Sequence, residues 1–197
     1  MSNAAKFVEG SLMRHIIVMS STSAVGLVSI FLVDLLDMWF ISLLGDSRLV
    51  AAIGFATTLT FFATSISIGT SIAAGALVSK CLGSKERELA KEYATNALII
   101  ASIVSVLCVI IMLLSMDILL GLLGAKGYVA QVAKTYLVIV MPASVLLAVG
   151  LGASAVLRAT GDAKGSMMST LSGGAVNAVL DPILIFSLGL GVTGAAI

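Results

Sequence analysis

Long apolar stretches alternate with short polar connections along this chain of 197 residues. A helix needs about 20 apolar residues to cross the hydrocarbon core of a bilayer, and five stretches are long enough. We expect membrane-spanning helices at about residues 16–44, 50–79, 93–116, 128–156 and 165–188, with a sixth beginning at about 191–197. The pattern predicts an all-α integral membrane protein, a polytopic helix bundle of residues 15–197 behind an amino-terminal segment of residues 1–14.

The composition agrees with a protein that has lipid as its solvent. Hydrophobic residues make up 59% of the chain and charged residues 11%, whereas a typical soluble domain has about 25% charged residues. The net charge of +1 gives no reason to expect a nucleic acid partner. Cys81 lies in a charged connection and Cys108 inside an apolar stretch, so the two thiols are expected at different depths and no disulfide is predicted.

The distribution of basic residues predicts the orientation. Lysine and arginine concentrate in the cytoplasmic connections of membrane proteins. Eight of the 11 basic residues fall on the amino-terminal side of the predicted bundle and three on the other side. We therefore expect a multi-pass protein of the plasma (inner) membrane with a cytoplasmic amino terminus.

Two connections contain residues that favour helix starts. Ser84 precedes the third stretch and is followed by Glu86 and Glu88, and Asp162 precedes the fifth stretch. Serine and aspartate side chains accept hydrogen bonds from the free N–H groups of a first helical turn. We expect Ser84 to cap the third spanning helix and Asp162 to cap the fifth.

Three carboxylates fall inside the predicted spans: Asp34, Asp37 and Asp181. An ionised carboxylate at the centre of a membrane helix costs about 2.5–3.5 kcal/mol on an insertion scale, and no lysine or arginine lies at a matching depth. Asp34 and Asp37, three residues apart, share one helix face. These acids must bind protons, bind a cation or face water, which favours a transport pathway over a passive scaffold. The alternative is that they bond to hydroxyl groups of neighbouring helices.

The segment NAVLDP, residues 177–182, gathers oxygen ligands on one side of a helix. Asn177 and Asp181 are four residues apart and share a face. Pro182 has no N–H, so the carbonyl of Ala178 loses its usual helical partner. A carboxylate, an amide oxygen and a free carbonyl form a reasonable half-site for a small cation, because hard cations take oxygen ligands. The alternative is a simple proline kink with satisfied polar neighbours.

Five motifs, taken together, give the chain a family resemblance. They are LDMWFISLLG at the end of the first span, LVSKCLGSKERELAKEY after the second, VLRATGDAKGSM between the fourth and fifth, NAVLDPILIF in the fifth, and LGLGVTGAAI at the end. In this order and spacing they resemble the amino-terminal lobe of the multidrug and toxic compound extrusion (MATE) transporters, over nearly the whole chain.

The resemblance implies twelve helices in two six-helix lobes that are related by a pseudo-twofold axis along the membrane normal. This chain would be the first lobe, with five complete spans and the start of the sixth. We therefore expect a fragment of a longer chain whose second lobe lies in the same full-length protein. The alternative is a small protein that a dimer partner completes.

The resemblance also implies a function and a set of site residues. The family members are secondary active antiporters, not enzymes, and they export amphipathic organic cations in exchange for Na⁺ or H⁺, with no other cofactor. The match places Asp37 at the family's acidic position and Asn177 and Asp181 at its cation-site positions, so that Na⁺ could bind there. Accessory candidates are Asp34, Ala178 and Pro182. Some members bend the first helix at a proline that is tied to proton coupling; the absence of such a proline here favours Na⁺.

Two other functions compete with drug export. A flippase for lipid-linked precursors has the same overall fold, but its pyrophosphate substrate calls for basic residues in the cavity, and the predicted spans contain none apart from Lys134, near the outer start of the fourth. An intramembrane aspartyl protease also uses aspartates from two helices. The Gly-x-Gly-Asp pattern of such enzymes is absent. The partial match Thr-Gly-Asp at 160–162 lies in a connection and not in a span.

Overall fold

The computed structural model describes residues 11–197, and within them the chain is helical without a β-strand. Five helices are long and apolar enough to cross a membrane, which confirms the predicted number of spans. They are α1 (Leu12–Ser42), α2 (Ser47–Gly83), α3 (Arg87–Leu114), α5 (Gly127–Ala159), and α6 (Ala163–Pro182), which continues as the π-helix η1 (Ile183–Ser187). Two short helices, α4 (Met116–Leu122) and α7 (Val192–Ala195), complete the set.

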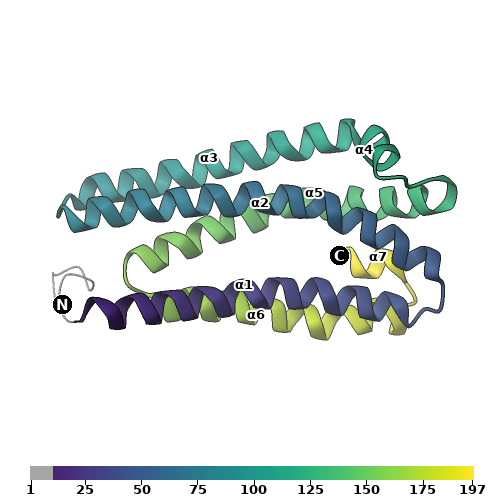
Figure 1. Cartoon of the computed structure of the whole chain (residues 1–197), viewed down its shortest axis with the longest axis horizontal. Helices are drawn as coiled ribbons and strands as arrows, with labels where there is room; N and C mark the ends of the chain where they lie inside the picture. The colour runs from purple at the N-terminus through teal and green to yellow at the C-terminus, as the bar shows by residue number, and fades with distance from the viewer. Residues whose placement is uncertain (1–10) are drawn as a thin grey trace.

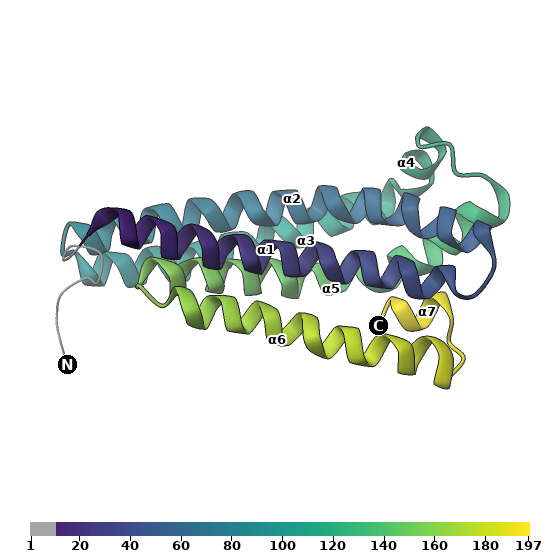
Figure 2. The same ribbon diagram turned by 60° about the horizontal axis from the view of Figure 1, so that its bottom comes forward.

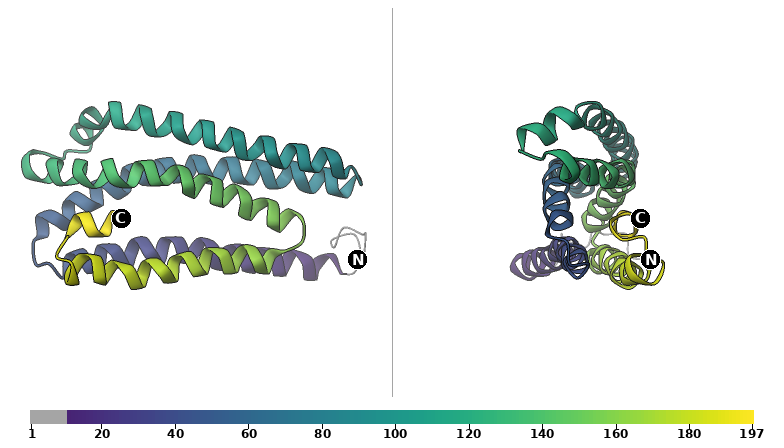
Figure 3. Two further views of the ribbon diagram at one scale, coloured as in Figure 1. Left: turned by 180° about the vertical axis from the view of Figure 1, so that it is seen from behind. Right: turned by 90° about the vertical axis from the view of Figure 1, so that its right-hand side faces the viewer.

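The long helices form two groups that lie roughly parallel to one long axis (Figure 1). Helix α1 packs along α6, whereas α2 packs against both α5 and α3. The pair α2 and α5 shares the most extensive contact, and α5 also reaches α6. Viewed along the bundle, α1 and α6 lie on one side and α2, α3 and α5 on the other (Figure 3). The facing sides of these groups can therefore enclose a polar interior.

The observed helices extend beyond most of the predicted limits. Helix α1 begins at Leu12 and α3 at Arg87, each several residues before the expected start. The predicted amino-terminal segment lies partly in α1, and its residues 1–10 lie outside the described part of the chain. Polar residues can continue a helix outside the hydrocarbon core, where water satisfies the free backbone groups. The apolar pattern thus marks the lipid-embedded part of each helix and not its ends.

The helix caps were predicted with mixed success. Asp162 caps α6, since its Oδ1 accepts a hydrogen bond of 2.9 Å from the N–H of Gly165. Ser84 does not cap α3; it lies just past the end of α2, and α3 begins after Glu86. Cys81, expected in a connection, lies buried in the last turns of α2. The continuation of α2 through this segment explains both differences.

At the other end of the bundle, the connection between α1 and α2 contains an ion pair, Asp46 with Arg48, that also caps α2. Asp46 accepts hydrogen bonds from the backbone N–H and the guanidinium of Arg48. These bonds hold the pKa of Asp46 below its usual value. The guanidinium of Arg48 also lies 4.9 Å from the centre of the Tyr128 ring, a cation–π contact. The first residues of α2 and α5 are thereby connected.

Large apolar side chains cover much of the outer surface. On α3, Ile99, Ile103, Leu107 and Ile111 are each more than half exposed. Such a surface would be unfavourable in water but suits lipid, so it supports the membrane assignment. The interior core lies toward the end of the bundle where α1 ends, and it includes Ile41, Ile53, Leu137, Met141 and Ile185.

The chain turns back on itself after Pro182. In η1 the N–H of Leu188 donates to the carbonyl of Ile183 at 3.0 Å, a π-helical bond. Gly191 has a φ of 55°, a left-handed conformation that glycine adopts easily. The turn directs α7 back against η1 and α5, between the two groups of long helices (Figures 1 and 2).

Candidate functional site

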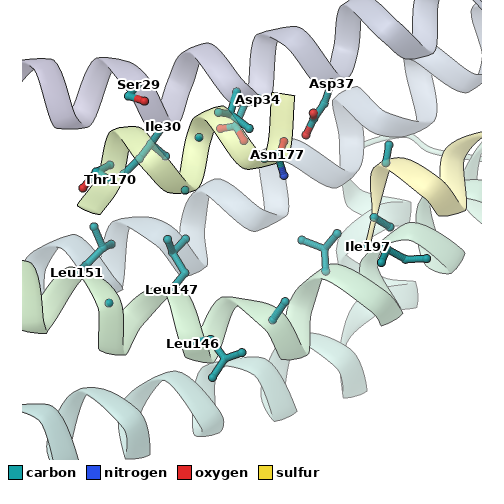
Figure 4. Close-up of a pocket in the computed structure, with 18 of the residues that line it drawn as sticks. Ser29, Ile30, Asp34, Asp37, Leu146, Leu147, Leu151, Thr170, Asn177 and Ile197 are labelled. Carbon is teal, nitrogen blue, oxygen red and sulfur yellow. The ribbon is translucent and has the colours of Figure 1, made fainter. Parts of the chain in front are cut away.

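A cavity of about 470 Å³ lies between α1, α5, α6 and the carboxyl-terminal residues. Asp34, Asp37 and Asn177 contribute its acidic and amide groups. Figure 4 shows these three side chains close together, with Leu146 and Leu147 of α5 across the cavity. None of the described residues that line the cavity is basic. The cavity therefore combines an apolar wall with a carboxylate-rich end.

Two of the predicted acids meet in the interior. Asp37 of α1 is 8% exposed and Asp181 of α6 is 3% exposed. The two carboxylates are neighbours in the interior. Asp37 lines the cavity, whereas Asp181 is not among the residues that line it. The packing of α1 along α6 thus brings together two residues that are 144 positions apart (181 minus 37).

Three buried oxygens of this group lack a hydrogen-bond partner among the described residues. They are Oδ1 of Asp37, Oδ1 of Asn177 and Oδ2 of Asp181. A buried polar atom without a partner is costly, and two neighbouring carboxylates in a low dielectric cannot both remain ionised and unpaired. These oxygens are suited to a cation or to a shared proton. The residues present therefore fit the predicted coupling ion.

Asp34 occupies a different position from the other acids. It lines the cavity with Asp37, but it is exposed and has no buried oxygen without a partner. Within residues 11–197, no three histidine, cysteine or acidic side chains are arranged to hold a metal ion. Asp37, Asn177 and Asp181 as ligands of a cation therefore stay a prediction.

The proline segment lies at the end of α6, and the π-helix that follows it was not predicted. Pro182 ends α6 and the π-helix begins directly after it. Ala178 lies half-buried one turn before, between Asn177 and Asp181 in sequence. Because Pro182 has no N–H, the carbonyl of Ala178 cannot accept the usual α-helical bond. That the carbonyl of Ala178 binds a cation stays a prediction.

A second cavity, of about 190 Å³, lies on the α2 side of the same acids. Thr57, Thr60 and Thr64 of α2 contribute hydroxyl groups, and Asp34 and Asp37 line this cavity as well. The acidic face of α1 thus separates two cavities. Asp37 therefore faces the threonines of α2 in one cavity and Asn177 of α6 in the other.

Tyr136 of α5 is a member of the site that the sequence analysis did not identify. It is 7% exposed and lines both cavities together with Asp37. Buried tyrosine hydroxyls usually find a hydrogen-bond partner. The available signal was a tyrosine well inside the fourth apolar stretch, and its role becomes visible only because α5 and α1 line the same cavities.

The comparisons with known proteins agree on one family. A family model described as MatE matches residues 23–183. The "FAD transporter" of Shewanella oneidensis is 31% identical over 191 residues, which cover 93% of this chain and 41% of that protein. "Multidrug export protein MepA" of Staphylococcus aureus is 28% identical over 165 residues, 83% of this chain and 36% of that protein. A solved structure, described as "Crystal structure of MATE in the bent conformation", has a TM-score of 0.93 and 27% identity, with 100% of this chain and 44% of that chain covered.

Five membrane-length helices, three of which enclose an acid-lined cavity, have the architecture of a lobe of a polytopic membrane transporter. With the match over residues 23–183, the chain belongs to the MatE family of multidrug and toxic compound extrusion proteins. It spans less than half the length of the relatives it matches, 41% and 36% for the two curated proteins.

Proposed function

We propose that the full-length protein is a secondary active antiporter that exports organic cations in exchange for Na⁺ or H⁺. The observation that carries this proposal is the group of three unsatisfied buried oxygens on Asp37, Asn177 and Asp181. Asp37 and Asn177 line the acidic end of a cavity large enough for a small organic molecule, and Asp181 lies next to Asp37. The same site can therefore hold the coupling ion next to the substrate.

The paired carboxylates provide a physical basis for coupling. When Na⁺ or a proton occupies the pair, the negative charge that attracts an organic cation is reduced. The coupling ion and the substrate then compete for the same charge, although they need not share one position. An ion that binds one conformation more tightly shifts the protein toward that conformation. If the ion and the substrate stabilise conformations that open to opposite sides of the membrane, the protein exchanges one for the other.

The cavity lining supports amphipathic cations as substrates. Apolar residues such as Leu146 and Leu147 suit a hydrophobic body, and Asp34 and Asp37 suit a positive group. No base lines this cavity among the described residues, so a pyrophosphate-bearing lipid precursor finds no counter-charge there. Membership in a transporter family also leaves no support for an aspartyl protease.

The complete transporter requires a second lobe and a membrane orientation. Transporters with repeated halves move one half against the other around a shared site, so we infer a second six-helix lobe in the full-length chain. The excess of basic residues at the end where α1 begins supports a cytoplasmic amino terminus and insertion in the plasma membrane.

Export of a flavin dinucleotide is a second candidate, because one relative at 31% identity is named an FAD transporter. Such a substrate is anionic, which the acidic cavity disfavours. One experiment separates the two. Full-length protein in proteoliposomes, under an imposed Na⁺ or proton gradient, should move the cationic dye ethidium and leave FAD in place. Gradient-driven movement of FAD without ethidium would replace the proposal by the second candidate.

A further inference from the structure

A third cavity, of about 330 Å³, lies near the end of the bundle where α1 begins, between α1, α2, α5 and α6. Arg158 is the one charged residue among the described residues that line it. Ile30 and Leu151 line both this cavity and the acid-lined cavity of about 470 Å³. The lobe thus has a carboxylate-rich chamber and an arginine-bearing chamber that meet at Ile30, Leu151 and Thr170.

The guanidinium of Arg158 is held in place and keeps unused hydrogen-bond donors. Its Nη1 donates to Oγ of Ser166 at 2.8 Å, and Ser166 is only 1% exposed. No carboxylate forms an ion pair with Arg158 among the described residues. A guanidinium has five N–H donors and stays charged at any physiological pH. One bond to a neutral hydroxyl leaves its charge without a counter-ion.

The cavity supplies further donors from other helices. The hydroxyls of Ser23 on α1 and Ser79 on α2 both line it and have no hydrogen-bond partner within residues 11–197. In contrast, the hydroxyl of Ser71 donates to the Ile68 carbonyl at 2.8 Å. Arginine binds phosphate through two parallel N–H bonds, and serine hydroxyls can add further bonds to phosphate oxygens.

We propose that the Arg158 cavity binds the phosphate group of an anionic ligand, with Ser23 and Ser79 as additional donors. Two sources have this chemistry: the headgroup of an anionic phospholipid in the adjacent leaflet, and a soluble phosphate. The site does not depend on the proposed ion coupling, which uses other residues at the opposite end of the lobe.

The experiment has two arms, both with purified full-length protein. In the first, native mass spectrometry counts the phosphatidylglycerol molecules retained by the protein. In the second, the melting temperature in lipid-free detergent is followed as inorganic phosphate is added. We expect Arg158→Gln to weaken retention or phosphate binding about tenfold or more, as loss of a charge-assisted pair predicts. Dependence on Arg158 in the first arm identifies a lipid, and in the second a soluble phosphate.

Three further variants keep the test decisive. Lys164→Gln removes an exposed charge near the same end and should change neither readout. Arg158→Lys keeps the charge but loses the two-pronged geometry, so it should bind more weakly than the original protein even if Arg158→Gln fails to fold. The proposal is overturned if Arg158→Lys binds both probes as the original protein does. It is also overturned if Arg158→Gln and Ser166→Ala lower the melting temperature equally and neither changes binding, because Arg158 would then only tie α5 to α6.

Discussion

Asp181 combines deep burial, at 3% exposure, with an oxygen that has no hydrogen-bond partner among the described residues. In the full-length protein we expect Asp181→Asn to abolish efflux driven by a Na⁺ or proton gradient. The amide preserves the shape of the side chain, but it cannot release a proton and offers one oxygen instead of two. Ethidium efflux from proteoliposomes measures the effect. Normal efflux under both gradients would mean that Asp181 only supports the end of α6.

Asn177 presents its unsatisfied Oδ1 near the same carboxylates. Asn177→Ala should raise the cation concentration for half-maximal efflux about tenfold, the effect of losing one bond to a charged group, while the maximal rate is retained. The matched control is Asn96→Ala on α3, where the side chain is exposed. Equal cation dependence in both variants would remove Asn177 from the site.

Asp34 and Asp37 differ in their surroundings although they share a helix face. Asp37 is buried against Asp181, whereas Asp34 is exposed into the cavities. Asp34→Asn should therefore weaken efflux less than Asp37→Asn, measured as the initial rate of ethidium efflux. Complete loss in both variants would show that the two acids act as one site.

At the scale of single elements, the start of α6 depends on a close contact between two residues. Asp162 caps the helix by accepting from Gly165, and a Cβ at Gly165 would overlap the carboxylate of Asp162. Asp162→Ala should cost about 1 kcal/mol of stability. Gly165→Ala should cost a similar amount because it displaces the same cap. The double variant should then be no less stable than the worse single variant, as thermal unfolding in detergent can measure. Additive losses would show that the two act separately.

The spans could be predicted from the sequence because lipid imposes a simple rule on apolar length. The acids at 37 and 181 were recognisable because unpaired charge is rare in that solvent. Helix α4 and η1 could not be predicted, since each depends on where the chain turns at an end of the bundle and not on periodicity. Tyr136 joins the site only because the fold places α5 and α1 around the same cavities. Ser84 fulfils the sequence pattern of a cap, but α2 continues through the preceding residues and α3 starts later.

At the scale of the whole molecule, one lobe cannot expose a central cavity alternately to both sides of a membrane. Residues 1–197 alone should therefore show no gradient-driven ethidium efflux, although the apolar helices should still insert in the membrane. Expression of this segment in cells, with insertion checked by membrane fractionation, makes the comparison. Efflux by the inserted segment would indicate that it completes itself, for example as a dimer.

Equilibrium ion binding can test whether Asp37, Asn177 and Asp181 form the coupling-ion site. Purified full-length protein is titrated with ²²Na⁺, and proton release on ethidium binding is recorded in parallel. Asp117→Asn is the control, because Asp117 pairs with Lys134 away from the cavities. We predict that the original protein and the control show either saturable Na⁺ binding or stoichiometric proton release. Asp37→Asn and Asp181→Asn should each abolish whichever of the two the original protein shows. Undiminished ion binding and proton release in those two variants would show that these residues do not form the coupling-ion site.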